Sequence, residues 1–125
     1  MEWKLLAGTD IVEIERIKDA IQKDDKFINR IYTDKEIEYC SKRSVSSYQS
    51  YAARFSAKEA AYKALSPYIK EDYSWKDFEI INNNEGKPEL KLHLSLDCKI
   101  ISIDLSISHC KEYAVCYVAA IVEEN

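Results

Sequence analysis

The sequence predicts an α+β fold, in which helices pack on one face of an antiparallel sheet. In the first half of the chain, between residues 11 and 65, apolar residues recur at the spacing of amphipathic helices. In the second half, residues 90–96 and 101–107 alternate between apolar and polar side chains, as half-buried strands do. Early helices followed by antiparallel strands are typical of the α+β class.

Length and composition point to one small domain. The 125 residues contain no linker, repeat or low-complexity tract, so residues 1–125 are predicted to form a single domain. A hydrophobic content of 46% is enough for a core. The net charge of -4 argues against nucleic acid or a membrane surface as a general partner, although it allows a local basic pocket.

Location and redox state are predicted from patterns that the sequence lacks. No run approaches the ~20 consecutive apolar residues of a membrane-spanning helix, and the first residues lack the pattern of a signal peptide. We therefore expect a cytoplasmic protein with no membrane partner. The four cysteines contain no CxxC pair, which argues against a zinc site, and we expect their thiols to be reduced.

The first elements are a strand and a helix. Residues 3–8 (WKLLAG) are predicted to form a short apolar strand that ends at Gly8. A first helix is expected from Ile11 to about Lys23, because apolar residues recur there at helical spacing. Asp10 stands just before this helix, where a carboxylate can cap the free amides of the first turn.

Two further helices are expected next. Thr33 and Glu36 have the spacing of a capping box, which predicts a second helix that begins just after Thr33. Residues 44–50 (SVSSYQS) are a polar break or a cap. A long helix is then expected over about 48–65, and it ends before Pro67 because proline cannot continue a helix.

The second half of the chain is predicted to consist of strands. Residues 78–81 form the first strand, and residues 82–88 (NNNEGKP) form a turn. The alternating segments 90–96 and 101–107 follow as half-buried strands. Residues 113–122 are almost wholly apolar, which predicts a central strand that is buried on both faces.

The long helix carries apolar residues on two opposite sides. At 100° per residue, Tyr51, Phe55 and Tyr62 share one narrow arc. Four small residues share the other arc, which lies roughly opposite: Ala53, Ala57, Ala60 and Ala64. We expect these arcs to pack the helix into its own subunit and against a partner subunit.

The charged residues of this helix lie between the two arcs. Glu59 and Lys63 occupy one gap at the spacing of a surface ion pair, which is the simplest interpretation. Arg54 and Lys58 occupy the other gap, and their like charges repel unless an anion lies between them. A site for phosphate and Mg²⁺ would explain both gaps, since Mg²⁺ takes one or two carboxylates and phosphate oxygens. Asp10 and Glu59 are the carboxylates that we expect to come together.

Three other positions have competing interpretations. Gly8 and Gly86 each stand beside a charged residue at a strand end, where a ligand could approach the backbone, and Gly86 could equally be an ordinary turn residue. His109 follows the strand 101–107, where a lone histidine is more often a solvated turn residue than a catalytic one. His93 lies on the polar side of its strand, and we interpret it as a surface residue.

Four segments together resemble a known family. They are GTDIVEIERI, RFSAKEAAYKAL, GKP and SISHCKEYA, and their order and spacing resemble those of the holo-acyl-carrier-protein synthases, the small stand-alone 4'-phosphopantetheinyl transferases. The resemblance covers nearly the whole chain. It implies the 4'-phosphopantetheinyl transferase fold and, for a chain of this length, a homotrimer that holds coenzyme A between its subunits.

The resemblance also implies an activity. Members of the family transfer the phosphopantetheine arm of coenzyme A to a serine of an apo acyl-carrier protein, and adenosine 3',5'-bisphosphate is released. By the same resemblance, Asp10 and Glu59 bind Mg²⁺, and Lys63 lies near the phosphates. His109 lies in the coenzyme-binding cleft, and Arg16 on the first helix meets the acidic carrier protein.

Further contacts with coenzyme A are expected from three parts of the chain. Arg54 and Lys58 are expected to offset phosphate charge, because phosphoryl transfer depends mainly on positioning and charge neutralisation. Ser108 belongs to the same SISH segment as the histidine. The turn contributes Gly86, Lys87 and Pro88. Glu59, acting through a water, is the first candidate for the base that takes the serine proton.

The sequence departs from the family pattern at three places, one of which, GTD in place of the commoner GID, leaves the Asp10 carboxylate intact. Cys110 stands where a threonine often follows the SISH segment, so that one hydroxyl donor is lost. Residues 65–68 (LSPY) replace a glycine-bearing turn whose backbone amides contact phosphate. Two alternatives to catalysis also stay open, namely an inactive module that binds coenzyme A or nucleotide and a protein-interaction domain. The presence of all four expected site residues argues against an inactive module: Asp10, Glu59, Lys63 and His109. The like charges of Arg54 and Lys58 would stay unexplained in a protein-interaction domain.

Overall fold

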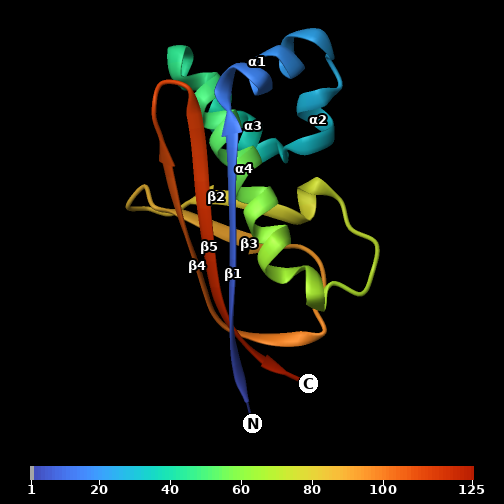
Figure 1. Cartoon of the computed structure of the whole chain (residues 1–125). Helices are drawn as coiled ribbons and strands as arrows, with labels where there is room; N and C mark the ends of the chain where they lie inside the picture. Colours follow the sequence, from blue (N-terminus) through green and yellow to red (C-terminus); the bar gives the residue numbers. More distant parts are fainter. Residues whose placement is uncertain (1) are drawn as a thin grey trace.

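The computed structural model describes residues 2–125 and confirms the α+β class (Figure 1). Within these residues, the first half of the chain contains β1 Trp3–Glu13, α1 Ile14–Lys23, α2 Phe27–Ile31, α3 Asp34–Ser41 and α4 Ser47–Leu65. The second half contains β2 Phe78–Asn82, β3 Pro88–Leu92, β4 Cys98–His109 and β5 Tyr113–Glu124. Short 3-10 turns lie at Ser44–Ser46, Ser66–Tyr68 and Trp75–Asp77. None of the described helices is long and apolar enough to cross a membrane.

The strands form two antiparallel sheets instead of the single sheet that the sequence predicts. The three long strands form one sheet in the order β1-β5-β4, and β2 pairs with β3 in a separate hairpin. This hairpin crosses behind the long strands in Figure 1. β5 is the central strand, as predicted. β3 ends at Leu92, so Leu94 and Leu96 pack against the core from a loop and not from the predicted strand 90–96.

α4 covers one face of the three-stranded sheet, which confirms the predicted packing of helix on sheet (Figure 1). Small side chains let its backbone lie close to the strands, and four of them are buried at this contact: Ala57, Ala60, Ala61 and Ala64. α1, α2 and α3 gather at one end of the long strands (Figure 1). There they enclose a second apolar cluster that includes Tyr32 and Tyr51.

β1 is longer than predicted and α1 begins later. The strand continues to Glu13, and the helix begins at Ile14 instead of Ile11. Asp10 is therefore a strand residue, and the N-cap position belongs to Glu13, whose side chain makes no cap hydrogen bond. The cause is strand pairing, because β5 offers β1 a continuous partner as far as Tyr113. The N-cap prediction for Asp10 is wrong, and its carboxylate is left for another role.

Local signals in the sequence predicted α3 and α4 but not α2. The capping box of α3 is confirmed, since the Glu36 amide donates to Thr33 Oγ1 at 3.3 Å and the Thr33 amide donates to Glu36 Oε1 at 2.9 Å. The long helix α4 also lies where the sequence predicts it. α2 was not predicted, because its five residues are too few to show a helical period.

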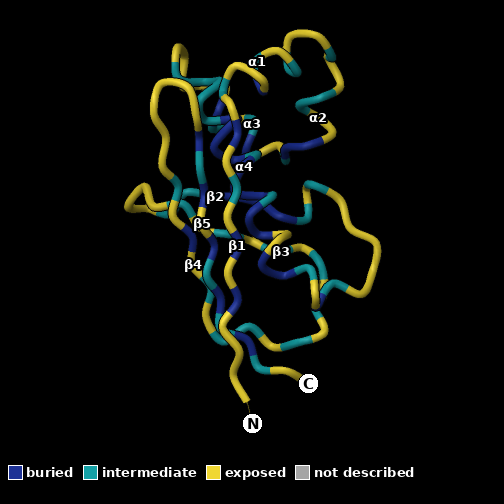
Figure 2. The backbone as a smooth tube through the Cα atoms, in the orientation of Figure 1, coloured by how far each residue is buried: buried dark blue, intermediate teal, exposed yellow. Residues whose placement is uncertain are grey.

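β5 is not buried on both faces, contrary to the prediction. Alternate residues from Ala114 to Val122 face α4 and are buried, whereas Tyr113 and Tyr117 point to the opposite face and are 41% and 51% exposed. Exposed residues continue along the long strands in Figure 2. We call the large apolar residues on this side the outer sheet face: Trp3, Leu5, Ile11, Tyr113 and Tyr117.

The aromatic arc of α4 is partly covered by its own chain. Its rings pack in three pairs: Tyr51 with Tyr32, Phe55 with Trp75, and Tyr62 with Tyr73. α2, α3 and the segment that follows α4 fold over this arc, although Tyr62 stays 37% exposed, and whether either arc also contacts a partner subunit stays a prediction.

Candidate active site

A close approach between β1 and α4 creates the site. A Cβ added at Gly8 would lie 2.1 Å from the Ala60 carbonyl oxygen and 2.7 Å from the Ala64 amide nitrogen. No side chain fits at such distances, so only glycine lets the strand run directly against the helix backbone. Gly8 therefore serves helix packing and not ligand approach. It brings the last turns of α4 beside Asp10, two residues further along β1.

Asp10 and Lys63 make the central contact of the site. The Lys63 ammonium lies 3.0 Å from Asp10 Oδ1, and it also donates to the Thr9 carbonyl oxygen at 3.1 Å. The Ser56 hydroxyl donates to the Asp10 carbonyl oxygen at 2.8 Å, which fastens the strand to α4 at this residue. The simple interpretation of Glu59 and Lys63 as a surface ion pair is wrong, because Lys63 reaches across to β1 instead.

Glu59 opens into the same cavity as Asp10. The cavity has a volume of about 470 Å³ and is lined by both carboxylates, by Arg16 and by apolar side chains of α1, α2 and α4. Burial raises the pKa of the Glu59 carboxyl, and the nearby Asp10 carboxylate raises it further, while Lys63 acts in the opposite direction. Two carboxylates therefore lie close enough to repel each other, with the Lys63 ammonium and the Arg16 guanidinium beside them, and a cation placed between the carboxylates would relieve that repulsion.

The donor set of this cavity fits Mg²⁺. The Lys63 ammonium already stands in a cation position at Asp10. Mg²⁺ takes one or two protein carboxylates and completes its shell with waters and phosphate oxygens. Within residues 2–125 there is no group of three or more His, Cys, Asp or Glu side chains that could hold a metal ion. Two carboxylates alone match Mg²⁺ better than a fully protein-ligated zinc ion.

The Lys58 ammonium points away from this cavity and into the protein interior. Its side chain is 0% exposed, and its ammonium lies 2.7 Å from Glu36 Oε1. It also donates to the carbonyl oxygens of Phe78 at 2.6 Å and Trp75 at 3.1 Å, so all three ammonium hydrogens are used. The prediction that Lys58 offsets phosphate charge is wrong. Its repulsion with Arg54 is relieved by a buried glutamate and not by a bound anion.

Arg54 and His109 line a second pocket of about 190 Å³. Arg54 Nη2 donates to Asn82 Oδ1 at 2.6 Å, and the guanidinium carbon lies 4.1 Å from the centroid of the Tyr39 ring. Arg54 is 4% exposed, and its buried Nε has no partner among the described residues. A buried guanidinium with an unused donor is suited to an anion. We call this the arginine pocket, with these lining residues: Tyr39, Arg43, Arg54, Asn82, Pro88 and His109.

The predicted turn residues lie in different environments. Pro88 lines the arginine pocket. Gly86 has a φ of 82°, which only glycine adopts readily, and its carbonyl oxygen accepts from Asn82 Nδ2 at 3.0 Å. Lys87 reaches away from the pocket, and its ammonium lies 2.7 Å from Asp104 Oδ1. Of the three turn residues, only Pro88 lines the arginine pocket directly.

The candidate residues of one chain form two groups on opposite sides of α4. Arg54 and Glu59 are five positions apart, which places them about 140° apart around the helix. His109 lines the arginine pocket from β4. Ser108 precedes it in the strand and points to the outer sheet face, because adjacent strand residues face opposite sides. We call the other group the carboxylate site: Asp10, Arg16, Glu59 and Lys63.

Sequence reasoning missed part of the arginine pocket. The Tyr39 ring lies beside two guanidinium groups, those of Arg43 and Arg54. Asn82 is the last residue of β2 and stands at the start of the predicted turn, which was a signal that could have found it. No comparable signal marks Tyr39, because its contact with Arg54 joins α3 to α4 through tertiary packing.

Known proteins with similar sequences share one description. Residues 7–118 match the 4'-phosphopantetheinyl transferase superfamily. A relative from Ruminiclostridium cellulolyticum, named holo-[acyl-carrier-protein] synthase, is 43% identical over 122 residues, which cover 91% of this chain and 90% of the relative. A relative of the same name from Geobacter sp. is 44% identical over 124 residues, covering 94% and 96%.

Solved structures share the fold. The holo-(acyl-carrier-protein) synthase from Bacillus anthracis, in complex with CoA (3',5'-ADP), has a TM-score of 0.74 at 36% identity, covering 96% of each chain. The Helicobacter pylori holo-[acyl-carrier-protein] synthase, in complex with coenzyme A, has a TM-score of 0.75 at 30% identity, covering 92% of this chain and 99% of the other. The fold and the carboxylate site thus define a small α+β domain suited to bind a cation beside an anion. The chain belongs to the 4'-phosphopantetheinyl transferase superfamily.

Proposed function

We propose that this protein transfers the 4'-phosphopantetheine arm of coenzyme A to a serine of an apo acyl-carrier protein. The proposal is carried by the convergence of Asp10, Glu59 and Lys63, because two carboxylates and an ammonium match the charges of a magnesium–phosphate complex. The serine oxygen bonds to the β-phosphorus, and the bond from that phosphorus to the bridging oxygen breaks. Adenosine 3',5'-bisphosphate leaves with the electron pair of that bond.

The carboxylate site supplies the charges that this reaction needs. Asp10 and Glu59 would hold Mg²⁺, which would supply Lewis-acid chemistry and charge neutralisation at the pyrophosphate. Lys63 turns from Asp10 to the phosphate oxygens and offsets charge on the leaving group. Glu59 takes the serine proton through a water.

We assign the arginine pocket to the adenosine bisphosphate end of coenzyme A. The unpaired Nε of Arg54 and the exposed ring of His109 are donors suited to phosphate oxygens. To reach both groups of one chain, a coenzyme would have to wrap around α4. We therefore place the carboxylate site of one subunit beside the arginine pocket of a neighbouring copy.

The outer sheet face supports a homotrimer, the assembly that the family resemblance implies. Ile11 of β1 lies diagonally opposite Tyr113 and Tyr117 of β5, and Trp3 and Leu5 extend the exposed apolar surface toward the other end of β1. Exposed apolar surface of this kind often marks an interface. Sedimentation at micromolar concentration should give three times the 14.5 kDa monomer mass. Tyr117→Glu should give monomers that have lost transfer. A wild-type protein that sediments as a monomer would overturn both the trimer and the shared site.

The activity itself is tested by incubation with coenzyme A, Mg²⁺ and an apo acyl-carrier protein, followed by mass spectrometry of the carrier. The expected result is a mass gain of one phosphopantetheine group, which a chelator abolishes. Binding of coenzyme A without transfer would favour an inactive binding module, and neither binding nor transfer would favour a protein-interaction domain. The same family assignment supports a cytoplasmic location.

A further inference from the structure

A buried ion pair adjoins the carboxylate site and has no part in the proposed chemistry. Lys58 of α4 and Glu36 of α3 lie 2.7 Å apart, and both side chains are completely buried. Lys58 immediately precedes Glu59 in the helix. The pair therefore acts on the backbone one residue before a proposed magnesium ligand.

Both partners of this pair are saturated with hydrogen bonds. Lys58 donates to Glu36 and to the two carbonyl oxygens described above. Glu36 also accepts from the backbone amides of Thr33 and Ile80, each at 2.9 Å. The pair consequently ties the middle of α4 to the start of α3, to the turn Trp75–Asp77 and to β2.

Stability alone does not explain a pair of this kind. Apolar residues of similar volume often replace a buried ion pair without loss of stability, because the desolvation of two charges offsets most of their attraction. Apolar side chains lack direction, however. A saturated ion pair satisfies its partners in one arrangement only, so here it sets how α4 is rotated against α3 and β2. Glu59 follows at 100° around the helix.

We propose that Lys58 and Glu36 are positioning residues for Glu59. The inference rests on the proposed function, which gives Glu59 its role as a ligand of Mg²⁺. The pair holds the rotation of α4, and it holds the carbonyl group of Trp75 as well. Trp75 lines the cavity that Glu59 shares with Asp10, so one ammonium orders both the carboxylate and the wall beside it.

The variant Lys58→Met tests the proposal, because it removes the ammonium and keeps an unbranched side chain. Binding of Mn²⁺ to the free protein is followed by electron paramagnetic resonance, at a temperature where circular dichroism shows the variant to be folded. The dissociation constant for Mn²⁺ should rise about 10- to 100-fold, the range found when the groups that orient metal ligands are removed. The transfer rate should fall, and added Mg²⁺ should restore part of it.

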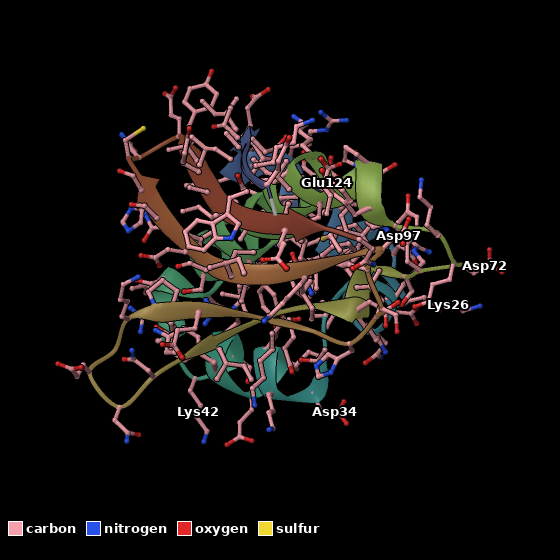
Figure 3. The ribbon with its side chains drawn as sticks, turned by 90° about the horizontal axis from the view of Figure 1, so that it is seen from below. Lys26, Asp34, Lys42, Asp72, Asp97 and Glu124 are labelled. Atoms are coloured by element: carbon pink, nitrogen blue, oxygen red, sulfur yellow. The ribbon has the colours of Figure 1, made fainter. Side chains whose placement is uncertain are left out.

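Two controls separate positioning from general damage. Val122→Ala removes buried methyl groups at the far end of β5, so it should lower the melting temperature and leave Mn²⁺ binding unchanged. Lys42→Met breaks an exposed ion pair with Glu38, and its side chain projects outward beyond α3 (Figure 3). It should leave both stability and Mn²⁺ binding unchanged.

The outcomes distinguish the two proposals. A wild-type protein that neither binds Mn²⁺ nor transfers the arm would overturn the proposed function and the positioning role together. An active wild type whose folded Lys58→Met variant binds Mn²⁺ equally well would overturn the positioning role alone. If Lys58→Met does not fold, Glu36→Gln replaces it, because glutamine keeps the shape of the buried side chain and removes its charge. A folded Glu36→Gln variant that binds Mn²⁺ as well as the wild type would then overturn the positioning role.

Discussion

Two lysines of α4 differ in almost everything except their sequence context. Lys58 and Lys63 both belong to the segment KEAAYK, and both were predicted to contact phosphate. The Lys58 side chain is 0% exposed and pairs with Glu36, whereas the Lys63 side chain is 51% exposed and pairs with Asp10. They lie about 140° apart around the helix, so one faces the closed side of α4 and the other the open side. The elements packed on each side decide which lysine is structural.

The two sides differ because of the strands and turns that flank them. On the closed side, α3 supplies a carboxylate and the segment 75–78 supplies two carbonyl oxygens, which together saturate the ammonium. On the open side, β1 is an edge strand of its sheet, and a cavity remains beside it. A charge on the closed side is therefore consumed by folding, whereas charges on the open side stay available for a ligand.

The largest expected effect comes from the carboxylates of the open side. Asp10→Asn and Glu59→Gln should each lower transfer at least ~10²-fold, because each removes a charge that binds Mg²⁺. The thermal stability of Glu59→Gln should rise although its activity falls. The pKa of folded Glu59 is raised, so its ionised form costs stability at neutral pH, above its unfolded pKa. Without divalent cations, Glu59→Gln should melt above the wild type. A wild-type transfer rate for Glu59→Gln at low Mg²⁺ would remove Glu59 from the site.

The close approach of β1 to α4 is tested by Gly8→Ala. The added methyl group would meet the Ala60 carbonyl oxygen, so strand and helix must separate. The free energy of unfolding should fall by roughly 3 kcal/mol, the upper end of the usual range for overpacking. Transfer should fall as well, even at temperatures where the variant is folded, because Asp10 and Lys63 move apart. Full activity in a folded variant would show that this spacing is unimportant.

The contrast between the two lysines is sharpened by Lys63→Met. Unlike Lys58→Met, this change should cost little stability, because the ion pair with Asp10 is partly exposed. Transfer should fall about 10-fold or more, because the phosphates lose a counter-charge. Binding of Mn²⁺ to the free protein should tighten several-fold, since the Lys63 ammonium no longer competes for Asp10. Weaker Mn²⁺ binding in this variant would show that the ammonium does not stand in for the metal.

Sequence reasoning succeeded where a signal is local. The capping box of α3 and the long period of α4 depend on residues within a few positions of one another, so both helices were predicted. The pairing of Asp10 with Glu59 was predicted from residue type and from the family resemblance, and the structure places both in one cavity. Their roles in catalysis stay predictions.

Sequence reasoning failed where tertiary contacts compete with a local pattern. Asp10 has the context of a helix cap, but pairing with β5 keeps it in a strand. Lys58 has the context of a phosphate ligand, but Glu36 arrives from another helix and buries it. The partner that buries Lys58 lies 22 residues earlier in the chain, from 36 to 58, and a pattern along one helix carries no information about such a partner.

The smallest expected effect lies at the rim of the open side, where Arg16 tests how the carrier protein docks. Arg16 is exposed on α1 and lines the same cavity as Asp10 and Glu59, so an acidic partner that brings its serine to the site passes close to it. Rim charges mainly steer association and lose force as salt screens them. Arg16→Glu should raise the KM for the carrier several-fold and barely alter the KM for coenzyme A. Both constants are measured at low salt.

Two comparisons decide whether position or net charge is responsible for the effect of Arg16→Glu. Lys23→Glu makes the same change in charge in the last turn of α1, outside the residues that line the cavity, and it should leave both constants nearly unchanged. Raising salt to ~0.3 M, where the Debye length falls well below 10 Å, should weaken the wild type toward the carrier and narrow its difference from Arg16→Glu. Equal increases in both constants for Arg16→Glu would mean that α1 shapes the active site and that the carrier docks elsewhere.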